Sequence, residues 1–161
     1  MYEIKITSTE QAKEFAKSGF AKPTIIIGIC NPYDLQFIDW RNTKNAVDVL
    51  RLLFRDNEGD SGMTENDAER VADFVTENMI DVKSILVYCT QGVSRSAGVA
   101  AAIGRVLNKD DSFVFSDASY CPNMRCYAQT AKKFGVNISE DELRKKYEAT
   151  RSQYCEDWPE I

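Results

Sequence analysis

Hydrophobic and polar positions alternate along this chain in patterns that predict both strands and helices. Largely apolar runs over Thr24–Cys30 and Val49–Phe54 are typical of inner strands covered on both faces, and Ser84–Tyr88 indicates a third strand. A weaker alternation over Tyr2–Ile6 indicates a strand at the edge of the sheet. Between these runs apolar residues recur at helical spacing, so strands and helices follow one another.

Several of the predicted helices begin at residues that favour helix N-termini. Ser8 precedes a short helix to Lys17, and Thr64 with Asp67 three positions later forms a variant of the capping box. The segment Asp110–Phe115 indicates a short extended or loop segment. Three further helices are expected, over Ser96–Leu107, Pro122–Phe134 and Ser139–Tyr154.

Strands that alternate with helices predict an α/β fold, in which helices flank a central, mostly parallel sheet of four to five strands. The chain has 161 residues, of which 43% are hydrophobic, and this is enough to bury a sizeable core. We therefore expect a single domain over residues 1–161.

The overall charge and the cysteine content narrow the range of partners and compartments. A formal net charge of −5 argues against a broad nucleic-acid or anionic-membrane surface. The first residues do not resemble a secretory leader, and the uncharged run Ser96–Gly104 is too short to cross a bilayer. Five scattered cysteines, an odd number, indicate reduced thiols, so we expect a cytoplasmic protein.

The chain contains no histidine, which excludes catalytic Ser-His and Cys-His pairs as well as histidine-bound metals. Cys121 and Cys126 have no second cysteine pair that would complete a structural zinc site. We therefore expect neither a metal nor a cofactor.

The most informative segment is Cys89–Ser96, with the sequence Cys-Thr-Gln-Gly-Val-Ser-Arg-Ser. The strand before it delivers Cys89 into a short loop that ends at the N-terminus of a helix, where backbone amides and the helix dipole favour negative charge. The same field stabilises a thiolate. Arg95 adds a planar set of donors suited to two oxygens of a phosphate. These features together predict a site for phosphate esters.

The pattern Cys-x5-Arg-Ser between a strand and a helix resembles that of the cysteine-dependent protein tyrosine and dual-specificity phosphatases, in particular their compact dual-specificity branch. Gly92 in the middle of the loop, Phe54–Asp56 at the end of a strand and Tyr120–Asn123 before a helix strengthen the resemblance, which runs roughly from Thr24 to Phe134. It implies a phosphatase-like P-loop and no cofactor. Pro122 and Asn123 are expected to serve the structure rather than the chemistry.

The resemblance also implies a role for each residue of the loop. Cys89 would be the nucleophile that forms a phosphocysteine intermediate, Arg95 would hold two phosphate oxygens, and Ser96 would donate a hydrogen bond to the sulfur. The phosphate oxygens would be bound by the loop residues Thr90, Gln91, Gly92, Val93, Ser94 and Arg95.

A general acid is expected on the loop that follows the preceding strand, where it would protonate the leaving group and then activate water. Two residues compete for this role. Asp56 is favoured because it directly continues the strand, and Asp60 beyond Gly59 is the alternative. Glu58 is a third and weaker candidate.

One residue departs from the family pattern, because Tyr88 stands where the family usually has a histidine before the cysteine. A tyrosine hydroxyl can donate a hydrogen bond but cannot carry a positive charge, so weaker stabilisation of the thiolate is expected than is usual in the family.

The resemblance implies hydrolysis of phosphotyrosine, with phosphoserine and phosphothreonine as further substrates, in a phosphorylated protein or peptide and without metal. Two alternatives stay open. The first is a phosphate-binding pseudophosphatase, motivated by Tyr88 and by the two competing candidates for the acid. The second is an RNA 5′-phosphatase, which the acidic balance disfavours. The loop positions Thr90, Gln91 and Val93 carry no lysine, which argues against an inositol-lipid substrate.

Overall fold

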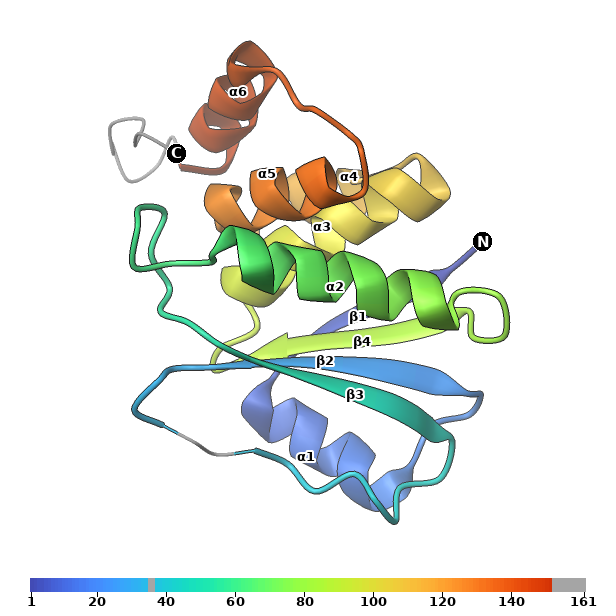
Figure 1. The fold of residues 1–161 in the computed structure, drawn as a ribbon. Coiled ribbons are helices and arrows are strands. Elements are labelled where there is room, and N and C mark those ends of the chain that lie inside the picture. Colours follow the sequence, from blue (N-terminus) through green and yellow to red (C-terminus); the bar gives the residue numbers. More distant parts are fainter. Residues whose placement is uncertain (35–36, 152–161) are drawn as a thin grey trace.

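A computed structural model of the protein describes residues 1–34 and 37–151, and in this part of the chain four strands form one sheet. The strands are β1 (Glu3–Ser8), β2 (Thr24–Cys30), β3 (Ala46–Leu53) and β4 (Ser84–Cys89), and the helices are α1 (Thr9–Ser18), α2 (Glu65–Asn78), α3 (Arg95–Asn108), α4 (Ser112–Phe115), α5 (Met124–Lys133) and α6 (Glu140–Arg151). The strand order is β1-β4-β2-β3 and every neighbouring pair is parallel (Figure 1). The predicted α/β fold with a parallel sheet is confirmed.

Helices cover the two faces of the sheet unequally. Of the described helices, α1 lies on one face, and α2 and α3 lie on the other (Figure 1). Successive residues of β4 point to opposite faces: Leu86 and Tyr88 pack with Trp40 on the α1 side, and Val87 and Cys89 pack with the core beneath α2 and α3. β4 is therefore buried on both faces, which explains its uninterrupted apolar sequence.

The position of β3 differs from the prediction. Val49–Phe54 was expected to be an inner strand, but β3 begins earlier, at Ala46. Within the described residues it forms an edge of the sheet, with β2 as its only partner. Val47 and Leu53 are about half exposed, whereas Leu52 is buried against the α2 side. The apolar residues of β3 reflect its packed face, but their pattern does not indicate whether a further strand lies beside β3. The prediction that the first strand lies at an edge is confirmed.

The capping residues place the helix starts where they were expected. Ser8 accepts a hydrogen bond from the Gln11 amide, and Thr64 accepts one from the Asp67 amide while the Asp67 carboxylate accepts one from the Thr64 amide. The segment at Asp110–Phe115 was predicted wrongly, because Ser112–Phe115 forms the short helix α4.

Two local features explain why α4 is helical. The Asp110 carboxylate accepts hydrogen bonds from both the backbone amide and the hydroxyl of Ser112, which fixes the first turn. Val114 is completely buried in the core between α3, α5 and α6, so burial favours the helical turn over an extended chain.

Helices α4, α5 and α6 form a layer beyond α2 and α3 (Figure 1). Arg105 of α3 pairs with Glu142 of α6, and Lys146 of α6 pairs with Asp111, so the first turns of α6 are fixed to the rest of the domain. The predicted end of this helix at Tyr154 lies outside the described residues. No helix in the described part of the chain has the length and apolar character needed to cross a membrane.

Candidate active site

The loop between β4 and α3, residues 90–94, is held from outside by its carbonyl groups. The carbonyl of Thr90 accepts a hydrogen bond from the Thr9 amide, that of Val93 from the Cys121 amide, and that of Ser94 from the Asn123 amide. In a trans peptide the C=O and the following N–H point in opposite directions. The amides that follow these carbonyls therefore point to the inner side of the loop, where they can bind an anion.

Gly92 makes this loop possible. Its φ is +70°, a left-handed conformation that side chains rarely adopt. A Cβ at this position would lie 2.5 Å from the carbonyl carbon of Thr7 and 2.6 Å from the nitrogen of Ser8, at the end of β1. Only glycine allows the end of β1 to approach the loop so closely.

We expect Gly92→Ala to lower stability by roughly 1–3 kcal/mol and to impair anion binding, because the loop must shift away from β1. Gly135→Ala is the matched control, since Gly135 also has a positive φ of +86° but has nothing within 4 Å of its Cβ position. Thermal unfolding and vanadate titration of both variants measure the difference. Equal effects in the two variants would show that the close approach to β1 is unimportant.

Cys89 is the last residue of β4 and faces a pocket of about 320 Å³. Its sulfur lies 3.0 Å from the hydroxyl oxygen of Ser96, in the first turn of α3. Burial raises the pKa of the Cys30 and Cys126 thiols, which favours their neutral form. Cys89 lines the pocket, at the end of β4 and before the N-terminus of α3.

Arg95 is 4% exposed and is fixed on one side by three hydrogen bonds. Its Nη1 donates to the Asn31 side-chain oxygen at 2.8 Å and to the Phe54 carbonyl at 2.8 Å, and its Nη2 donates to the Thr90 hydroxyl at 3.2 Å. Its Nε is buried without a hydrogen-bond partner among the described residues. The guanidinium therefore keeps a buried donor beside the pocket, which an oxyanion can satisfy.

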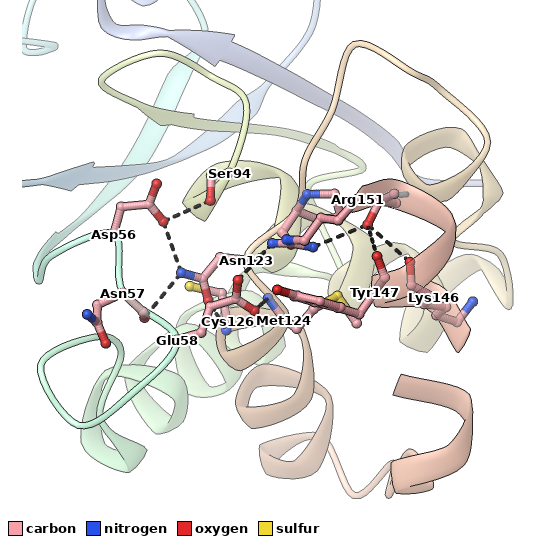
Figure 2. Close-up of polar contacts among 12 residues, drawn as sticks. Asp56, Asn57, Glu58, Ser94, Asn123, Met124, Cys126, Lys146, Tyr147 and Arg151 are labelled. Atoms are coloured by element: carbon pink, nitrogen blue, oxygen red, sulfur yellow. Dashed lines mark hydrogen bonds and ion pairs between the residues drawn. The ribbon is translucent and has the colours of Figure 1, made fainter. Parts of the chain in front are cut away.

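The two candidates for the general acid have different positions. Asp56 lines the pocket together with Cys89. Its Oδ1 accepts hydrogen bonds from the Ser94 hydroxyl at 2.8 Å and from the side-chain nitrogen Nδ2 of Asn123 at 3.0 Å. Figure 2 shows both contacts. Asp60 has a fully exposed side chain, which forms an ion pair with Arg125 at 4.0 Å.

Glu58, the third candidate, does not line the pocket that contains Cys89. Its two carboxylate oxygens accept hydrogen bonds from Arg151 at 2.8 Å and from the backbone amide of Met124 at 3.0 Å (Figure 2). We call residues 55–63, which carry Asp56, Glu58 and Asp60, the acid loop.

Tyr88, which departs from the family pattern, lies on the face of the sheet opposite to Cys89. Its ring packs against Trp40, with ring centroids 6.1 Å apart. Its hydroxyl end occupies the space where a side chain at Gly28 of β2 would lie. Burial raises the pKa of the Tyr88 hydroxyl. Its position makes it a core residue of the α1 side rather than a part of the pocket wall.

The structure brings most of the predicted site residues into one pocket. Three of them do not line it: Asp60 is exposed, Ser96 is buried beside the Cys89 sulfur, and Gly92 lies against the end of β1. Asn31 was missed by the sequence reasoning, although it both lines the pocket and anchors Arg95. Asn123, which was expected to serve the structure, caps α5 and also donates a hydrogen bond to Asp56. The residues gathered around the pocket are Asn31, Asp56, Cys89, Thr90, Gln91, Val93, Ser94 and Arg95.

Comparison with solved structures finds similarity at low sequence identity. DUSP15 aligns with a TM-score of 0.58 and 16% identity over 92% of each chain. Human DUSP28 has a TM-score of 0.49 and 15% identity over 95% of this chain and 99% of its own, and the active form of Tk-PTP has 0.48 and 13% over 94% and 92%. No protein-family model and no curated protein matches the sequence. The chain has the fold of the dual-specificity phosphatases.

Proposed function

We propose that this protein is a cysteine-dependent phosphatase that hydrolyses phosphotyrosine, and also phosphoserine and phosphothreonine, in phosphorylated proteins. One observation carries the proposal. A single pocket joins Cys89 and Arg95, which lie at the two ends of one loop, with Asp56, which comes from a separate segment of the chain. Nucleophile, oxyanion donor and acid are the three functions that the hydrolysis of a phosphate monoester requires.

In the first step the sulfur of Cys89 attacks phosphorus, the bond between phosphorus and the leaving oxygen breaks, and Asp56 gives that oxygen a proton. Both hydrogen bonds to Asp56 go to Oδ1, so within the described residues Oδ2 is the oxygen available to carry the proton. The inner amides of the loop and the free Nε of Arg95 stabilise the phosphoryl oxygens.

In the second step Asp56 removes a proton from water, the water oxygen attacks phosphorus, and the bond between sulfur and phosphorus breaks. Ser96 lies 3.0 Å from the sulfur and can donate a hydrogen bond to the departing thiolate. Inorganic phosphate is released and Cys89 returns to its starting state.

The test is a rapid-quench reaction with an aryl phosphate, followed by mass spectrometry of the peptide that contains Cys89. We expect a burst of phenol release and a phosphorylated Cys89, because a good leaving group makes the second step slow relative to the first. Binding of vanadate without any turnover would instead identify a phosphate-binding pseudophosphatase. Faster turnover of an RNA 5′-triphosphate end than of a phosphotyrosine peptide would identify an RNA phosphatase.

A further inference from the structure

We propose that Arg151, the last described residue of α6, is a positioning residue that holds the acid loop so that Asp56 faces Cys89. This inference rests on the proposed function. It assigns a role in the reaction to a side chain that does not line the pocket and that lies far from Asp56 in the sequence.

Arg151 is buried where α6 meets the acid loop. The residue is 4% exposed, its Nη2 donates to Glu58 Oε1 at 2.8 Å and to the Pro122 carbonyl at 2.9 Å, and its guanidinium carbon lies 4.3 Å from the centre of the Tyr147 ring. Figure 2 shows Arg151 pointing from α6 toward this junction. A buried guanidinium needs such partners, because an unpaired buried charge is costly.

Arg151 contacts the residue before Asn123 directly and the residue after it through Glu58. Arg151 bonds the carbonyl of Pro122 directly, and it bonds Glu58, whose second oxygen accepts from the amide of Met124 at 3.0 Å. Asn123, between these two residues, donates to Asp56 Oδ1 at 3.0 Å and to the Asn57 carbonyl at 3.2 Å. Arg151 therefore fixes both the loop that carries Asp56 and the residue that holds Asp56.

Attachment of α6 to the domain does not depend on Arg151 alone. The first turns of α6 are fixed by the pairs of Glu142 with Arg105 and of Lys146 with Asp111, and Leu143 is buried in the core. A change at Arg151 should therefore release the acid loop without detaching the whole helix. This separation makes a positioning role testable.

The test compares Arg151→Met, which keeps an unbranched apolar stem, with Arg151→Lys, which keeps the charge. The readout is kcat/KM for aryl phosphates of increasing leaving-group basicity. We expect Arg151→Met to lose about ten- to a hundredfold on poor leaving groups, as a small misplacement of a reacting group does, and little on good ones that need no acid. Arg151→Lys should restore part of the loss. Glu58→Gln, which removes the other half of the ion pair, should give the same dependence on the leaving group.

Two outcomes would overturn the inference. One is an equal loss for all leaving groups in Arg151→Met, and the other is a further loss when Arg151→Met is added to Asp56→Asn, because a residue that acts through Asp56 has no effect once the acid is gone. If the wild-type protein shows no turnover at all, the proposed function fails. Hydrogen exchange then tests separately whether Arg151 holds the acid loop. Faster exchange at the Met124 amide in Arg151→Lys and Glu58→Gln would support the holding of the acid loop by Arg151, and unchanged exchange would overturn it.

Discussion

Cys89→Ser should abolish turnover while leaving the binding of phosphate or vanadate in place. A serine hydroxyl at this position is a far weaker nucleophile than a thiolate, and no histidine exists in the chain to activate it. Loss of the attacking atom typically costs about 10⁴- to 10⁶-fold in kcat. The inner amides of the loop and Arg95 stay as they are, so the anion keeps its other partners.

The measurement pairs aryl phosphate kinetics with calorimetric titration of vanadate. Cys121→Ser is the matched control, because Cys121 is a partly exposed thiol that does not line the pocket. Its turnover should stay within about twofold of wild type, as is usual for substitutions away from buried features. Turnover that persists in Cys89→Ser would remove the sulfur from the mechanism, and loss of vanadate binding would mean that the substitution disturbed the loop itself.

The loop between β4 and α3 was predictable from the sequence because its parts are contiguous. A buried strand, a glycine, an arginine and the start of a helix lie within a few positions of Cys89, so local structure alone brings them together. The strand–helix order likewise fixed the fold class. These inferences needed only periodicity and the chemistry of a helix N-terminus.

Contacts between segments that lie far apart in the chain could not be predicted from the sequence. Asn31 lies just after β2 and meets Arg95 only because β2 and β4 are neighbours in a parallel sheet, whose strand ends lie at the same edge. The pairing of Glu58 with Arg151 depends on how α6 folds back on the domain. The edge position of β3 was hidden for the same reason, since strand order is a property of the assembled sheet.

Asp56→Asn should impair turnover strongly and in proportion to the basicity of the leaving group. General acid catalysis contributes about 10²- to 10⁴-fold, so the larger loss is expected for alkyl phosphates such as phosphoserine, whose alkoxide leaves poorly without a proton. The amide oxygen of asparagine can still accept from Ser94 and Asn123, so the loop should keep its place. The variant therefore removes the proton without removing the contacts.

Asp60→Asn is the matched control, because it makes the same chemical change on the same loop at a fully exposed side chain. Its kcat/KM should stay within about twofold of wild type for every leaving group. Measuring both variants with one aryl phosphate series and a phosphoserine peptide decides between the two carboxylates. A loss confined to Asp60→Asn would mean that the acid loop rearranges when substrate binds. Equal, small losses in both variants would place the proton donor outside this loop, since Asp56, the carboxylate that lines the pocket with Cys89, would then not be the general acid.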